Sequence, residues 1–125
     1  MKRIAAACVL IILIGTVCAV NGIYIEKTYE DFKTDITELK SVFKEDNAAA
    51  AKKSAELEEK WVAKEDFLSL FVNHDIVDTL GVSIAKLPVY AQENSPEMFL
   101  SECRGIELEL LHMLKDAQIT THSVF

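Results

Sequence analysis

The chain has 125 residues, of which half are hydrophobic, and its 20 Asp and Glu outnumber its 13 Lys and Arg. That length leaves room for one domain after the apolar beginning of the chain. With Lys2 and Arg3 set aside, 11 basic residues face all 20 acidic ones, so the remainder carries a formal charge of −9. Binding to phosphates needs a clustered positive face, and we therefore expect no nucleic-acid partner.

The N-terminal segment has the pattern of a membrane anchor. Lys2 and Arg3 precede an uncharged run from residue 4 to residue 20, and apolar residues continue to Ile25. About 20 apolar residues are enough to cross a bilayer, and positive residues favour the cytoplasmic side. We predict a transmembrane anchor over residues 1–25 that contacts lipid through residues 4–25. The N-terminus is expected in the cytoplasm of this single-pass cell-membrane protein, and the rest outside.

Two alternatives concern processing of this segment. The small residues of Val17-Cys18-Ala19 would also suit a signal peptidase that cleaves after Ala19, which would give a secreted helical protein. The apolar run continues past that point to Tyr24, a residue typical of a membrane interface, which favours an uncleaved anchor. A lipoprotein site at Cys18 is disfavoured, because Val17 is β-branched where such a site needs a small residue.

The strongest periodic signal follows the apolar segment. Apolar residues recur there at alternating spacings of four and three, which indicates one face of an amphipathic helix. The residues on this face are Ile25, Tyr29, Phe32, Ile36, Leu39 and Phe43. We expect the face to pack against other helices of the same chain. Pairing between the first helices of two copies is the alternative.

Three more helices are expected. The first runs from about residue 48 to Phe71 or Val72. The second, over about 75–92, carries the apolar residues Ile76, Leu80, Ile84, Leu87 and Ala91, and the third, over about 96–117, has an inner face of Phe99, Cys103, Ile106, Leu110, Leu114 and Ala117. Asp46 or Asn47 can cap the first of these, and Pro88 should kink or shorten the next. Ser95 before a proline is a typical start for the last. The sequence thus predicts an all-α fold in which a transmembrane or signal-anchor helix precedes an antiparallel bundle of about four amphipathic helices. The helical domain is expected over 26–118, and a tail over 119–125.

The residue types that commonly catalyse reactions or bind metals occur here without the other residues that such sites need. Glu109 and His112 have the spacing used by di-iron bundles, but no second pair accompanies them, and His112 is expected to face solvent. Cys103 falls on the predicted inner face of its helix, so we expect a buried thiol, with pairing between chains as the alternative. No catalytic, cofactor-binding or metal-binding residue is therefore predicted, and no cofactor.

His74 is the remaining candidate for a site. It lies between two predicted helices, next to Asn73 and Asp75, with Asp78 one turn away. Asn73 or Asp75 is expected to cap the following helix, while a ligand-sensing or metal-sensing site around His74 is the alternative.

The segment 61–78 carries a resemblance to a known family. Trp61, then the apolar 67–71, then 73–76 and Asp78 look like the helix-to-helix junction of short, uncharacterised membrane-anchored proteins of Gram-positive-type bacteria, known as a domain of unknown function. The resemblance implies an anchor followed by an extracytoplasmic helical domain, and it transfers no catalytic residue. Trp61, His74, Asp75 and Asp78 are the candidate interaction residues.

These observations predict a function without catalysis. We expect a membrane-anchored helical module that acts through protein–protein contacts at the outer face of the membrane, with an unknown protein or a second copy of itself as partner. An extracytoplasmic sensing domain and a cleaved secreted protein are the alternatives.

Overall fold

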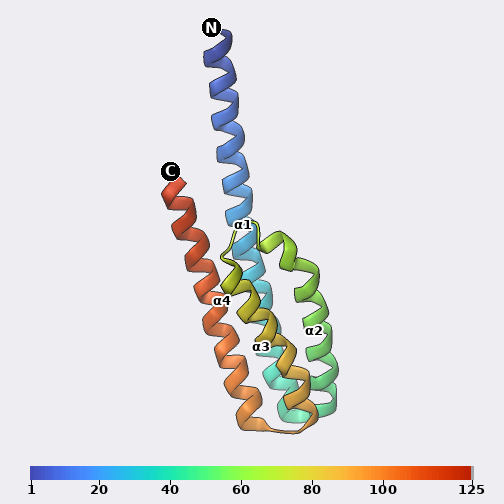
Figure 1. Ribbon diagram of the computed structural model, residues 1–125. Helices are drawn as coiled ribbons and strands as arrows, with labels where there is room; N and C mark the ends of the chain where they lie inside the picture. The colour runs from blue at the N-terminus through green and yellow to red at the C-terminus, as the bar shows by residue number, and fades with distance from the viewer. Residues whose placement is uncertain (125) are drawn as a thin grey trace.

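The computed structural model describes residues 1–124, and side chains as far as Gln118. These residues form four α-helices and no strand: α1 (Lys2–Glu45), α2 (Asn47–Leu68), α3 (His74–Gln92) and α4 (Pro96–Val124). In Figure 1 the second half of α1 lies beside the other three helices in an antiparallel bundle, and the first half of α1 projects beyond it. The predicted all-helical fold is confirmed.

α1 is one continuous helix of 44 residues. At 1.5 Å per residue it is about 66 Å long. The anchor and the first bundle helix expected from the sequence are therefore two parts of a single helix. The N-terminal part of α1 is strongly apolar and is not buried by the other helices, so α1 is long and apolar enough to span a membrane.

The core of the bundle uses the apolar face predicted for α1. Ile25, Phe32, Ile36 and Leu39 are almost completely buried, and α1 packs against both α2 and α4. One position differs from the prediction, because Thr28 is buried and Tyr29 lies half-buried at the edge. This face is covered by helices of the same chain, as expected, and it is not free to pair with a second copy.

Capping residues set the junctions around α2. The Asp46 carboxylate accepts hydrogen bonds from the backbone N–H groups of Ala48 and Ala49, at 3.0 and 3.3 Å. α2 ends at Leu68, earlier than the predicted Phe71 or Val72, and a turn follows to Asn73. The Asn73 side chain accepts a hydrogen bond from the N–H of Asp75 at 2.9 Å, so Asn73 caps α3.

α3 and α4 follow the predicted faces closely. Pro88 lies inside α3, but the helix continues past it to Gln92. The predicted inner residues of α3 are all buried, namely Ile76, Leu80, Ile84, Leu87 and Ala91. Asn94 takes a φ of 51°, a left-handed conformation that Asn tolerates, and this lets the chain turn into α4. α4 runs to Val124, beyond the predicted end near Ala117; of the expected tail, Phe125 lies outside the described residues.

Candidate functional site

The structure separates the candidate interaction residues into two groups. His74, Asp75 and Asp78 are exposed on the first turns of α3. His74 and Asp78 are four residues apart and so lie on the same side of the helix. Among the described residues no group of three or more His, Cys, Asp or Glu could bind a metal ion. A sensing site around His74 stays a prediction.

Trp61 lies in the core, where its side chain is 1% exposed. Its ring packs edge-on against Phe32 of α1, with the ring centroids 5.2 Å apart. Gly81 of α3 is also close to the ring, because a Cβ atom at that position would lie 3.4 Å from the indole Nε1. Within the described part of the chain this N–H donates to no acceptor. Trp61 therefore joins α1, α2 and α3 by packing, and no surface contact is open to it.

A charged group between α1 and α2 was not predicted from the sequence. Lys60 of α2 places its Nζ 2.6 Å from Oδ2 of Asp31 and 2.8 Å from Oδ2 of Asp35. The same Nζ lies 4.9 Å from the ring centroid of Phe32. Burial works to lower the pKa of Lys60, but the hydrogen bonds and charges of the two carboxylates outweigh it, and the pKa is raised. We call Lys60, Asp31 and Asp35 the Lys60 clamp. In the sequence, the one indication of this group was the spacing of its two acids, which lie four residues apart and therefore on the same side of α1.

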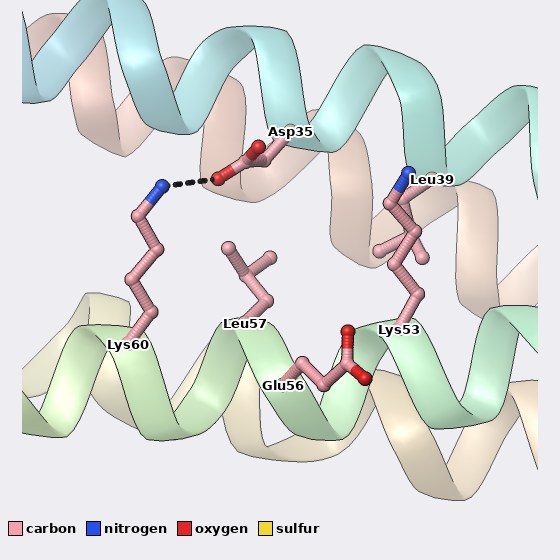
Figure 2. A pocket seen from close by; sticks show the side chains of 6 residues that line it. All are labelled: Asp35, Leu39, Lys53, Glu56, Leu57 and Lys60. Carbon is pink, nitrogen blue, oxygen red and sulfur yellow. Dashed lines mark hydrogen bonds and ion pairs between the residues drawn. The ribbon is translucent and has the colours of Figure 1, made fainter.

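The hollow beside the Lys60 clamp is too small to be a binding pocket. It has a volume of about 180 Å³ and is lined by Leu39 and Leu57 with charged side chains around them. Figure 2 shows Lys60 reaching from α2 to Asp35 on α1, with Leu57 between Lys60 and Lys53. Ligand pockets usually enclose about 300–1,000 Å³. This arrangement therefore fastens two helices together and offers little space for a substrate.

Cys103 is fully buried on α4, as its position on the predicted inner face indicated. Burial, together with the charges of Glu107 and Glu102, raises its pKa to about 12, although the nearby Lys40 acts in the opposite direction. The nucleophilic and metal-binding form of cysteine is the thiolate. A thiol kept protonated and covered in this way is a packing residue, and it is not accessible for pairing between chains.

His112 lies on the opposite side of α4 from the core. Its side chain is 67% exposed, and Nδ1 lies 3.7 Å from a carboxylate oxygen of Glu109. Its predicted exposure is confirmed.

A larger hollow lies at one end of the bundle, between α1 and α4. It has a volume of about 700 Å³, and its lining residues are Cys18, Ala19, Gly22, Ile23, Ile25 and Glu26 of α1 and Leu114, Lys115, Ala117 and Gln118 of α4. Cys18, Ala19, Gly22 and Ile23 make the α1 side mainly apolar. At this end of the bundle the uncharged part of α1 reaches the other helices, so apolar surface is concentrated there.

The fold and these sites define a class: a four-helix bundle whose first helix extends into a long, exposed apolar segment. The chain belongs to the family described as a domain of unknown function, DUF4363, which it matches over residues 20–124. The match takes in the end of the apolar segment and all of the bundle. Searches of curated proteins and of solved structures found no match.

Proposed function

We propose that this protein is a membrane-anchored helical module that acts through contacts with other proteins at the outer face of the membrane, without catalysis. The observation that carries the proposal is the exposed first half of α1. Large apolar side chains such as Ile4, Leu10, Ile12 and Val20 are each more than half exposed. A contiguous apolar surface of this size calls for lipid or a partner, because exposing it to water is strongly unfavourable.

Charge supports the proposed orientation. Lys2 and Arg3 precede the apolar part of α1, and residues 26–33 after it carry three acids, Glu26, Glu30 and Asp31, against two bases, Lys27 and Lys33. Under the positive-inside rule the N-terminus would be cytoplasmic and the bundle outside. Thiol labelling of intact cells with a membrane-impermeant maleimide tests this. A cysteine placed at exposed Met98 should react in intact cells, and reaction only after lysis would contradict the orientation.

The outer face of α3 supports a role in protein contacts. Val82 and Val89 are 57% and 50% exposed, and Ala85 between them is also exposed. Spacings of three and four place these residues in one row on the helix, which is a surface that another helix can pack against. The bundle core is complete without this row, so its apolar character is not needed for folding.

Pull-down of the full-length chain from a detergent extract tests the proposed role. The wild-type chain should recover a specific protein or a second copy of itself, and Val82→Glu with Val89→Glu should abolish that recovery. Leu108→Glu on α4, at a site that is 51% exposed, is the matched control and should leave recovery unchanged. A strictly monomeric chain without partners would contradict the proposal. Equal recovery of the partner by the Val82→Glu, Val89→Glu chain and by the Leu108→Glu chain would contradict it as well.

A further inference from the structure

An exposed group of apolar side chains lies at the junction of α2 and α3. Leu70 is 73% exposed and Phe67 is 46% exposed, and the ring of Phe71 lies 5.2 Å from that of Phe67 between centroids. We call Phe67, Leu70 and Phe71 the apolar tip. The turn after α2 is closed by backbone hydrogen bonds from Leu70 to Phe67 and from Phe71 to Leu68, at 3.2 and 3.0 Å. The apolar tip is therefore an ordered turn that presents Leu70 outward.

Two contacts hold the apolar tip in place, one with α1 and one with α4. Phe67 packs against Tyr24, and their ring centroids are 4.8 Å apart. From α4, the carboxylate of Asp116 accepts a hydrogen bond from the backbone N–H of Asn73 at 3.3 Å. Tyr24 lies just before Glu26, the first charge after the apolar run. The apolar tip thus lies beside the boundary between the uncharged and charged parts of α1.

Because of the direction of α2, the apolar tip lies beyond the boundary between the charged and uncharged parts of α1. α2 runs antiparallel to α1, so the chain after Phe67 continues toward the apolar half of α1 (Figure 1). Three residues of helix or tight turn advance by about 5 Å, which places Leu70 at the level of the last apolar turns of α1. Amphipathic segments that lie in a membrane interface bury their apolar side chains about 5–10 Å deep.

We propose that the apolar tip is a second membrane contact, in which Leu70 and the edges of Phe67 and Phe71 enter the lipid interface beside α1. This inference rests on the proposed anchoring of α1 and deepens it. The occupant is lipid because the tip is continuous with the apolar half of α1 through the Tyr24–Phe67 contact. The charges nearby are of both signs, with Lys64 5.8 Å from the Tyr24 ring centroid and Asp66 exposed on α2. Insertion of apolar side chains, and not attraction to anionic lipid, therefore makes this contact.

Fluorescence quenching of the full-length chain in phosphatidylcholine vesicles tests the contact. Cys8→Ala and Cys18→Ala remove the accessible thiols, and buried Cys103 stays unlabelled. A fluorophore is attached to Leu70→Cys, to Leu13→Cys within the apolar half of α1, or to Met98→Cys at the opposite end of the bundle. Leu70, Leu13 and Met98 are all exposed, so none of these substitutions disturbs the core.

The expected result is that spin-labelled lipid quenches the labels at positions 70 and 13 several-fold more than the label at position 98. Spin labels near the headgroup should act most on position 70, and deeper ones on position 13. Quenching at position 13 with none at position 70 overturns this inference and leaves the anchor intact. If position 70 is shielded from both lipid and aqueous iodide, a protein covers the tip and the inference is wrong. Absence of quenching at position 13 overturns the proposed anchor itself.

Discussion

Tyr24 of α1 and Phe67 of α2 pack edge to face, with ring centroids 4.8 Å apart and ring planes at 69°. The contact joins the end of the apolar part of α1 to the last turn of α2. Lys64 lies over the same Tyr24 ring at 5.8 Å. These aromatic and cationic side chains gather where the bundle meets the exposed half of α1, and amphipathic side chains of this kind are typical of a membrane interface.

Replacing Trp61 tests the packing centre of the bundle. Trp61→Ala should lower the free energy of unfolding by about 3–5 kcal/mol, because it leaves a cavity between three helices. Trp61→Phe should cost much less, since it keeps the ring contact with Phe32 and removes an indole N–H that has no acceptor among the described residues. Urea unfolding in detergent, followed by circular dichroism, measures both. Equal losses for the two variants would contradict this assignment.

The Lys60 clamp should contribute more than a single surface ion pair. Lys60→Met keeps an unbranched side chain of similar length but leaves Asp31 and Asp35 without their partner. We expect a loss of about 1 kcal/mol after allowance for solvent screening. Lys53→Met is the matched control, because Lys53 pairs only with exposed Glu38 among the contacts described, at 3.0 Å. That variant should lose less than about 0.5 kcal/mol. Thermal unfolding at low and high salt compares them, and an equal effect of both would count against the clamp.

Alkaline pH should destabilise the bundle. Cys103 has a pKa of about 12 in the folded chain, and a thiol in the unfolded chain titrates near its ordinary value. Between these two pH values the unfolded state binds fewer protons than the folded one, so stability falls as pH rises. Lys60 acts in the same direction, because its pKa is also raised by folding. Both contributions are fully present at neutral pH.

In Cys103→Ala the free energy of unfolding should therefore decrease less steeply with pH than in the wild type. The difference should begin at about pH 8.5, the ordinary pKa of a thiol. The slope that remains in Cys103→Ala above about pH 10 belongs to Lys60, whose pKa is raised in the folded chain. Unfolding curves recorded across this range, for wild type and variant, give the comparison. An unchanged slope between wild type and Cys103→Ala would show that this thiol does not titrate as its burial requires.

The start of α2 depends on Asp46, whose carboxylate accepts hydrogen bonds from the N–H groups of Ala48 and Ala49. Asp46→Ala should lower the free energy of unfolding by about 1 kcal/mol. Asp46→Asn should restore most of it, because Asn is a comparably good capping residue. Glu45→Ala, one residue earlier, serves as the control. A loss with Asn as large as that with Ala would mean that charge, and not the capping hydrogen bonds, is responsible.

Local periodicity was enough to predict most of the core. The faces of α1, α3 and α4 follow from apolar spacing alone, because each helix buries one stripe. Tyr29 was expected on the buried face, but Thr28 is the buried residue and Tyr29 lies at the edge. A spacing of three or four fits either residue, and the packing of the neighbouring helices decides between them. The Lys60 clamp and the Tyr24–Phe67 contact join residues far apart in the chain, and a local sequence pattern does not predict such pairs.

The ends of the helices were harder to predict. The apolar run after Phe67 continues the helical pattern, yet α2 stops at Leu68 and leaves Leu70 exposed. The polar residues after Gln118 suggested a tail, although the α4 backbone remains helical to Val124. Of the candidate interaction residues, the exposure of His74, Asp75 and Asp78 and the burial of Trp61 depend on how α2 and α3 pack, which spacing does not determine.

The retention of the apolar half of α1 in the membrane is the central claim, and intact mass spectrometry of the protein isolated from washed membranes tests it most directly. We expect a chain that still contains Met1 to Ala19 and that resists extraction at alkaline pH. A mature chain that begins at Val20 and is recovered in the soluble fraction would contradict the claim.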